Sequence, residues 1–120
     1  MSITILVPVP TPSLNRLYGR HWSAKHRAKR QWGMLILASA QTAAVRGQNF
    51  PRARVSITRT GPRLLDYDNL VAGCKSTVID NLVAQGYIAG DDPERLTVEY
   101  HQKVSRKGPH QTVITIERVG

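Results

Sequence analysis

Four short segments of the chain carry the hydrophobic pattern of β-strands. They are rich in β-branched residues or alternate apolar with polar side chains, and they cover residues 3–9, 52–59, 96–101 and 113–118. A proline-rich stretch after the first segment predicts an ordered but irregular loop at residues 11–20. Residues 105–110 separate the last two segments with turn residues, so we expect these two strands to form an antiparallel hairpin.

Two longer segments carry apolar residues at helical spacing. In residues 23–45 the apolar side chains, Trp32 among them, form one stripe and Lys25, Lys29 and Arg30 lie off it. This pattern predicts a long amphipathic helix with a basic face. A second helix is expected to run from about residue 67 to residue 85, with Gly86 as its stop and an apolar face formed by Val71, Cys74, Val78 and Leu82.

The order of these elements indicates the fold class. Strand, helix, strand, helix, strand and strand follow one another (β-α-β-α-β-β), and neither an internal repeat nor a Gly- or Ser-rich linker divides the chain. We therefore predict a single α/β domain over residues 1–120, with a mixed β-sheet of about four strands and two helices packed on it.

The charge of the chain narrows the class of its partner. The chain has 17 Lys and Arg residues against 8 Asp and Glu residues, a net charge of +9 that favours polyanions. The first 65 residues contain eleven of the basic side chains and no acid, whereas all five aspartates lie within residues 66–92. Nucleic acid is therefore the leading partner class, and the clustered carboxylates need an explanation of their own.

The sequence favours neither a membrane nor a secreted protein. Cys74 is the only cysteine and cannot form an internal disulfide, which favours a reducing, cytoplasmic setting. The apolar run at residues 3–9 contains Pro8 and is far shorter than the roughly 18 residues of a membrane-spanning helix. Cys74 and Trp32 both lie on apolar helical faces, so we expect them in the core.

The candidate chemistry centres on residues 66–69, Asp-Tyr-Asp-Asn. In an extended segment, residues two apart point to the same side, so Asp66 and Asp68 are expected to present two carboxylates together where a helix begins. The next loop adds Asp91 and Asp92. Like charges repel unless a cation lies between them, and Mg²⁺ is usually held by a few carboxylates and water. The pattern therefore indicates a magnesium site.

Helix capping is the alternative explanation of these acids. Asp68 or Asn69 at the start of a helix can accept a hydrogen bond from a free backbone N–H and complement the helix dipole. Capping accounts for Asp68, but it explains neither the second acid two residues earlier nor the acidic pair on the next loop.

A basic protein with clustered aspartates suits the cleavage of a phosphodiester. Carboxylate-bound Mg²⁺ can activate the attacking water and neutralise the growing negative charge, while Lys and Arg side chains hold the polyanion. Lys75 lies two helical turns after Asp68 and leans toward the carboxylates, so it either steadies the phosphate or is a solvated surface residue. We interpret Asp80, which lies off that line, as a surface or structural acid.

A set of motifs in a fixed order adds a family resemblance. They are Pro-Val-Pro-Thr-Pro-Ser-Leu-Asn-Arg-Leu-Tyr, Asp-Tyr-Asp-Asn-Leu, Ile-Asp-Asn-Leu, Gly-Tyr and Asp-Asp, at residues 8–18, 66–70, 79–82, 86–87 and 91–92. Together they resemble the RusA family of Holliday junction resolvases, found in prophages and bacteria. The resemblance covers nearly the whole chain. It implies a homodimeric, Mg²⁺-dependent endodeoxyribonuclease that resolves four-way DNA junctions by paired, symmetric nicks, without a small-molecule cofactor.

The resemblance also assigns the site residues one by one. It implies that Asp66 and Asp68 are the first two metal-binding carboxylates and that Asp92 is the third, with Asp91 as its substitute if the loop is read one residue out of register. Lys75 is the best match to the family's helical lysine, and Ser76 and Ala72 compete for that place.

The expected DNA contacts come from the loop at residues 11–20, the basic helix face and the surroundings of Asp66. The family's basic residues before the first Asp are replaced here by leucines at residues 64 and 65, with Arg63 slightly further back. For Asn15 and Arg16, turn chemistry is an equally good explanation. The candidate DNA-binding residues are Asn15, Arg16, Arg20, Lys25, Lys29, Arg63 and Asn69.

Two other functions remain open at this point. The first is a non-catalytic, basic nucleic-acid-binding module, in which the acids are helix caps and surface charges. The second is a metal-dependent nuclease that acts on other branched DNA, such as flaps or forks.

Overall fold

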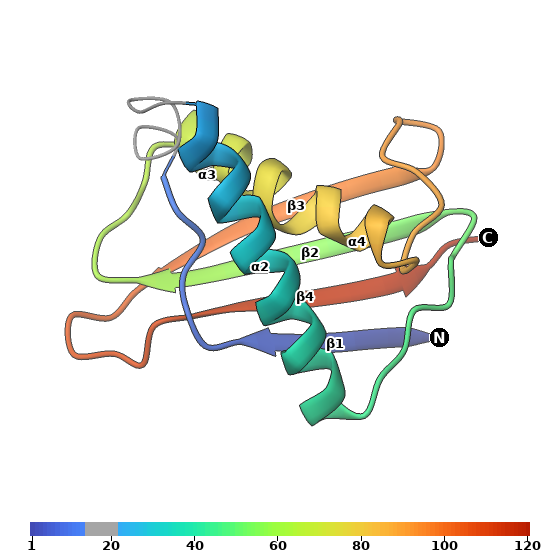
Figure 1. Cartoon of the computed structure of the whole chain (residues 1–120), viewed down its shortest axis with the longest axis horizontal. Coiled ribbons are helices and arrows are strands. Elements are labelled where there is room, and N and C mark those ends of the chain that lie inside the picture. The colour runs from blue at the N-terminus through green and yellow to red at the C-terminus, as the bar shows by residue number, and fades with distance from the viewer. Residues whose placement is uncertain (14–21) are drawn as a thin grey trace.

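Four strands form one mixed sheet, in the order β1-β4-β2-β3 (Figure 1). The computed structural model describes residues 1–13 and 22–120, and for residues 22–25 it describes the backbone alone. The strands are β1 (Ser2–Val7), β2 (Ala53–Gly61), β3 (Leu96–Val104) and β4 (Gln111–Arg118). Their order along the chain is the expected one.

The central position of β4 overturns the expected hairpin. β4 pairs antiparallel with both β1 and β2, whereas β2 and β3 run parallel, so β2 separates the last two strands. Burial explains this choice, because Ile114 and Ile116 of β4 have no exposed surface and suit a central strand. β3 instead exposes Glu99, His101 and Lys103, and charged side chains are typical of an edge strand.

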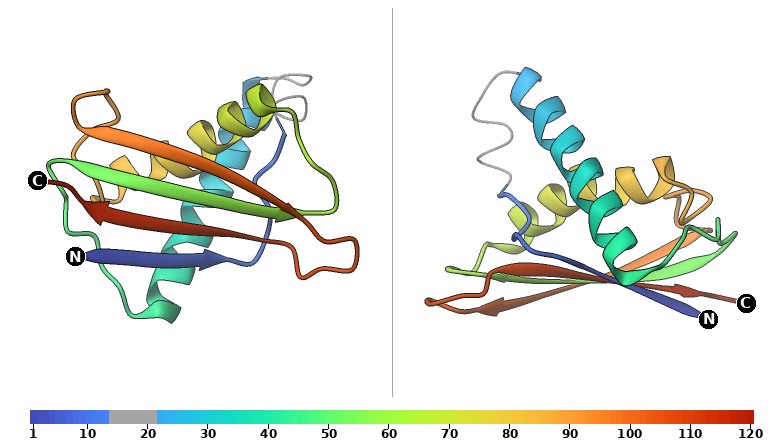
Figure 2. Two further views of the ribbon diagram at one scale, coloured as in Figure 1. Left: turned by 180° about the vertical axis from the view of Figure 1, so that it is seen from behind. Right: turned by 60° about the horizontal axis from the view of Figure 1, so that its bottom comes forward.

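Two helices cover one face of the sheet (Figure 2). The first is α2 (Trp22–Ala43). The second, here called the α3–α4 rod, consists of α3 (Tyr67–Cys74), the π-helical turn η1 (Lys75–Ile79) and α4 (Asp80–Ala84). The expected α/β domain, with a mixed four-stranded sheet and two helices in β-α-β-α-β-β order, is therefore confirmed.

The α3–α4 rod ends at Gly86, as the sequence predicts. Gly86 has a φ of 77°, and the N–H of Tyr87 donates to the carbonyl oxygen of Leu82 at 2.9 Å. The N–H of Gly86 also donates to the carbonyl of Val83 at 3.2 Å. This pair of bonds is the Schellman motif, in which glycine adopts the left-handed conformation without steric strain.

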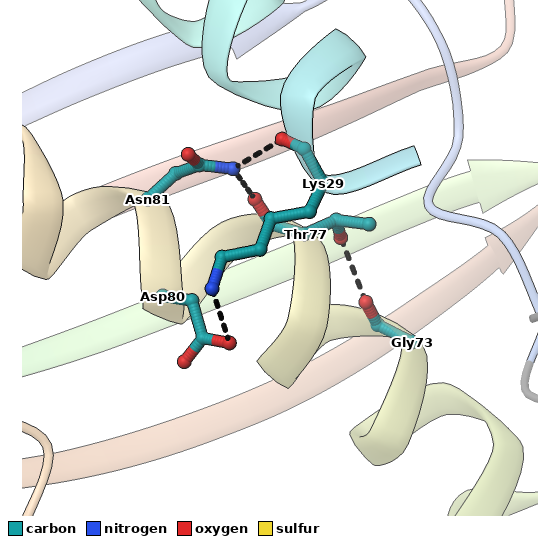
Figure 3. A network of polar contacts seen from close by, with 5 residues as sticks. All are labelled: Lys29, Gly73, Thr77, Asp80 and Asn81. Atoms are coloured by element: carbon teal, nitrogen blue, oxygen red, sulfur yellow. Dashed lines mark hydrogen bonds and ion pairs between the residues drawn. The ribbon is translucent and has the colours of Figure 1, made fainter. Parts of the chain in front are cut away.

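The π-helical turn of the rod is a feature that the apolar spacing does not reveal. The Asp80 N–H donates five residues back, to the Lys75 carbonyl, which widens the turn. One side chain within the turn and one just after it donate to backbone carbonyls: Thr77 Oγ1 donates to Gly73 at 2.7 Å, and Asn81 Nδ2 donates to Thr77 at 2.7 Å (Figure 3). A hydroxyl and an amide side chain thus add hydrogen bonds to backbone carbonyls where the helix widens.

The hydrophobic core lies between the sheet and the two helices. Alternate residues of every strand point toward the helices, and they pack against Trp32, Ile36 and Ala40 of α2. The predicted core positions of Trp32 and Cys74 are confirmed, since both side chains are buried. The apolar face of the rod was expected to begin at Val71, but Val71 is only half-buried. The first buried residue of the rod is Leu70. In the part of the chain that the structure describes, no helix is long and apolar enough to cross a membrane.

Candidate functional site

Asp66 is the N-cap of α3. Its backbone is extended (φ −65°, ψ 160°), and its Oδ1 accepts a hydrogen bond from the N–H of Asn69 at 2.9 Å. Its Oδ2 accepts a second bond, from Asn69 Nδ2 at 2.7 Å. Capping therefore does occur here, but by Asp66 rather than by the expected Asp68 or Asn69. Each carboxylate oxygen keeps further lone-pair directions open, because it accepts only one of these bonds.

Asp68 lies in the first turn of α3 with its side chain exposed. The helix begins at Tyr67, so the extended pairing of the two acids is replaced by a cap and a first-turn residue. Both carboxylates still lie at the start of one helix, where the backbone N–H groups favour negative charge. The prediction that both acids lie at the start of a helix is therefore correct. The helix begins at Tyr67, however, so that only Asp66 has the extended backbone that was expected for both residues.

The segment that carries Asp66 is clamped to the edge strand. The side-chain amide of Gln102 in β3 makes two bonds to the backbone of Leu65: its Oε1 accepts from the N–H and its Nε2 donates to the carbonyl, both at 2.8 Å. Tyr67 packs edge-on against Tyr100 of the same strand, with ring centroids 6.1 Å apart. The residues before and after Asp66 are thus both held by β3.

A buried arginine holds the other side of this segment. Arg59 of β2 donates from Nε to the carbonyl of Thr11 at 2.8 Å and from Nη1 to the carbonyl of Arg63 at 3.1 Å. It thereby joins the N-terminal segment to the loop that leads into α3. Burial lowers the pKa of the Arg59 guanidinium, with an opposing effect of Cys74. The sequence analysis did not identify this residue. The signal was available, because residue 59 continues the alternation of Ala53, Val55 and Ile57 and so lies on the same, inward-facing side of the strand.

Asp91 and Asp92 lie at the other end of the α3–α4 rod. Their loop is tied to the start of β2, since the Ala53 N–H donates to the Arg95 carbonyl at 2.8 Å, whereas Asp66 follows the end of β2. The intervening rod has 18 residues and therefore a length of about 25 Å. Figure 2 shows the start of α3 and the loop after α4 far apart over the sheet.

The fold of one chain therefore does not bring Asp92, or its substitute Asp91, to Asp66 and Asp68. Among residues 1–13 and 26–120, no group of three His, Cys, Asp or Glu side chains could hold a metal ion. Asp92 instead organises its own loop: its Oδ1 accepts from the N–H of Glu94 at 3.2 Å, and its Oδ2 lies 3.5 Å from Arg95 Nε. The two acidic pairs were expected to meet at one magnesium site, because Mg²⁺ is held by several carboxylates, but the α3–α4 rod lies between them and keeps them apart.

The other expected site residues, apart from Lys29, divide into three groups. Lys75 is exposed on the first residue of η1, and Arg63 is exposed in the loop before Asp66. Asn69 is half-buried and holds Asp66, as described above. The expected contacts of Asn15, Arg16, Arg20 and the Lys25 side chain lie outside the described residues.

Lys29 has a partner within the chain. Its Nζ lies 3.5 Å from Oδ2 of Asp80, which is half-buried, and its backbone carbonyl accepts a 3.0 Å bond from Asn81 Nδ2 (Figure 3). One turn on, Gln85 Nε2 donates to the carbonyl of Gly33 at 2.8 Å. These contacts fasten α2 to the α3–α4 rod, so Asp80 is a structural acid, as interpreted, and the DNA contact of Lys29 stays a prediction.

The core next to the site also perturbs two titrating groups. Burial raises the pKa of the Cys74 thiol to about 11, against the lowering effects of a hydrogen bond to Thr11 and of Arg59. Burial raises the pKa of Tyr100 to about 12, with smaller contributions from Cys74 and Tyr67. Both groups are neutral near pH 7, and neither is a nucleophile there.

No protein-family model matches the chain, and no curated protein matches it.

Proposed function

We propose that this protein is a Mg²⁺-dependent, RusA-like endodeoxyribonuclease that resolves four-way DNA junctions by paired nicks, in cytoplasmic recombination and repair. The observation that carries the proposal is the pair of carboxylates at the start of α3, in a chain of net charge +9. Two neighbouring carboxylates on a DNA-binding surface repel phosphates unless a metal ion neutralises them, so their presence favours a metal site.

The residues at this position suit a magnesium ion. Asp66 and Asp68 offer hard oxygen ligands, and Asp66 has a fixed orientation because both of its oxygens accept bonds from Asn69. When bound, Mg²⁺ supplies an activated water and neutralises charge on the phosphoryl oxygens. Lys75, on the same rod, is the proposed cation beside the phosphate.

The proposed third carboxylate comes from a second copy of the chain. Asp66 and Asp92 lie at opposite ends of the α3–α4 rod, so a two-fold axis across the middle of two antiparallel rods would bring each end to the opposite end of the other copy. Each of two equivalent sites would then combine Asp66 and Asp68 of one copy with Asp92 or Asp91 of the other. Such a homodimer matches the two-fold symmetry of a four-way junction and of paired nicks.

A second candidate function is a non-catalytic nucleic-acid-binding module. The observation in its favour is that Asp66 already has a structural role as the N-cap of α3. A nuclease for other branched DNA, such as flaps, would share the same site and differ only in its preferred substrate.

Cleavage of a synthetic junction tests the proposal directly. The wild-type chain and Asp68→Asn are incubated with a four-way junction or a linear duplex, in Mg²⁺ or EDTA, and the strands are resolved on a denaturing gel. We expect paired nicks in the junction alone, lost in EDTA and in Asp68→Asn, with junction binding retained. Asp68 is the better variant because Asp66 also caps the helix.

Glu99→Gln provides the matched control, because it removes one exposed carboxylate from β3 and should cleave like wild type. Tight junction binding without cleavage in any divalent metal would support the binding module instead. Preferred cleavage of a flap or fork in competition with the junction would support the other nuclease.

A further inference from the structure

The guanidinium of Arg59 occupies a core position. The inward-facing residues of β2 before it, Ala53, Val55 and Ile57, are apolar and buried, and Arg59 itself is only 7% exposed. Gly61, the next inward residue, makes room for the side chain, because a Cβ there would overlap Arg59 Nη1. Such a position demands that the charge be compensated, since ionised groups are rarely buried without a counter-ion.

The described residues supply no counter-ion to Arg59. The acceptors of its two hydrogen bonds, the carbonyls of Thr11 and Arg63, are neutral. None of the ion pairs among the described residues includes Arg59. Residues 14–25, whose side chains are not described, contain no Asp or Glu, so they do not supply a carboxylate either.

One end of the guanidinium remains open to solvent. Nη2 of Arg59 has no hydrogen-bond partner among the described residues. It is also not sealed in the core, because in the same part of the chain the only buried side-chain nitrogen or oxygen atom without a partner is Oε1 of Gln85. Among the described residues, Nη2 of Arg59 therefore has no acceptor, and it keeps some contact with solvent.

Arg59 lines a cleft of about 630 Å³. Proline residues of the N-terminal segment and the ring of Trp32 form apolar walls, and Arg63 adds a second, exposed guanidinium. Apolar walls lower the local dielectric constant and strengthen the attraction between a guanidinium and an anion. Leu65, which also lines the cleft, directly precedes Asp66, so the cleft lies beside the proposed site.

We propose that this cleft binds a phosphate group of a DNA strand, with the guanidinium of Arg59 as its inner donor and Arg63 as the cation at its rim. The guanidinium fork matches the oxygens of a phosphate, and a bound phosphate supplies the counter-charge that the described residues do not provide. The identity of the ligand as DNA depends on the proposed function, whereas phosphate binding by the cleft is measurable without cleavage. The strand would then enter the site through this cleft, one residue away from Asp66.

A titration with a minimal phosphodiester tests this inference. The full chain, labelled with ¹⁵N, is titrated with the dinucleotide TpT at constant ionic strength, and the Arg59 Nε–H and Trp32 indole signals are followed by NMR. Inorganic phosphate and sodium chloride are titrated in parallel. We expect saturable shifts of both signals with TpT, and none with chloride.

Two variants distinguish specific binding of TpT in the cleft from non-specific attraction of an anion to a basic protein. Arg59→Met removes the buried charge, and Arg106→Met removes an equal charge from the exposed turn between β3 and β4. Binding of TpT, followed at the Trp32 indole, should weaken about tenfold or more in Arg59→Met and stay unchanged in Arg106→Met. If Arg59→Met does not fold, Arg63→Met gives the same comparison, because the bond to Arg59 involves only the backbone of residue 63.

Two outcomes would overturn the inference. Equal weakening in the Arg59 or Arg63 variant and in Arg106→Met would show general charge attraction only. Shifts with inorganic phosphate but none with TpT would assign the cleft to a free phosphate rather than to a strand. Binding of TpT by a protein that cleaves no junction would leave the cleft in place and remove the nuclease proposal, and the reverse result would do the opposite.

Discussion

Gln102 pairs with both backbone polar groups of Leu65, one residue before the candidate carboxylate Asp66. The side-chain amide thereby acts as a short extension of β3, and it holds a loop that has no strand of its own at this point. The two 2.8 Å bonds fix the direction in which the chain enters α3. The position of the acidic pair is thus set from the edge strand.

We predict that Gln102→Ala reduces cleavage without abolishing the fold. Loss of two hydrogen bonds to a half-buried backbone should lower the free energy of unfolding by roughly 1–3 kcal/mol and let the Asp66 segment move. Urea denaturation and junction cleavage measure the two effects. His101→Ala is the control, because its exposed side chain points to the other face of β3; an equal loss of activity in that variant would rule out the clamp as the cause.

The two carboxylates at the start of α3 should differ in their effect on stability. Asp66→Ala removes the N-cap and should lower the free energy of unfolding by about 1 kcal/mol, whereas Asp68→Ala should change it by less than about 0.5 kcal/mol. Both variants should lose cleavage. Denaturation curves and gel assays on the same preparations check this, and cleavage retained by a folded Asp68→Ala would exclude Asp68 as a ligand.

Mixing two inactive variants tests whether the site is shared between copies. Alone, Asp68→Asn and Asp92→Asn should each be inactive. In a mixed dimer one site combines both substitutions and the other has none, so an equal mixture should recover about one quarter of the wild-type sites. These dimers should make single rather than paired nicks, as seen on denaturing and native gels. A mixture as inactive as its components would instead place all ligands within one chain.

The free energy of unfolding at alkaline pH should depend on the ionisation of Cys74. Its thiol has a pKa of about 11 in the folded chain, above the ordinary value of 9.0, so the folded state retains the proton longer than the unfolded state does. The resulting stabilisation is complete below about pH 9 and is lost as the pH rises through 11. The free energy of unfolding of each protein is measured by urea denaturation and compared with its own value at pH 8. Between pH 9 and 11 this free energy should fall less in Cys74→Ala than in the wild type.

The buried thiol also gives a direct chemical readout. A protonated, fully buried Cys74 should react slowly with a thiol reagent at pH 8 and rapidly after addition of denaturant. Fast reaction in the native protein would contradict both the burial and the raised pKa.

The sequence by itself determined the elements and most of the core. Helical spacing identified the apolar stripe around Trp32 and the buried side of the rod around Cys74, because side-chain direction along a helix depends only on local periodicity. Gly86 marked a helix end for the same local reason. The acidic pair was located at a helix start from Asp66 to Asn69, since capping chemistry is also local.

The tertiary structure decided everything that depends on distance between elements. It inserted β2 between β3 and β4, because strand pairing follows burial of whole faces rather than the turn that links two strands. It placed Asp92 at the far end of the rod from Asp66, and it gave Lys29 an acidic partner. It also buried Arg59 under the loop that leads to Asp66, with no ion-pair partner among the described residues. Local spacing carries no information on such positions, because they arise only when residues far apart in sequence share one core.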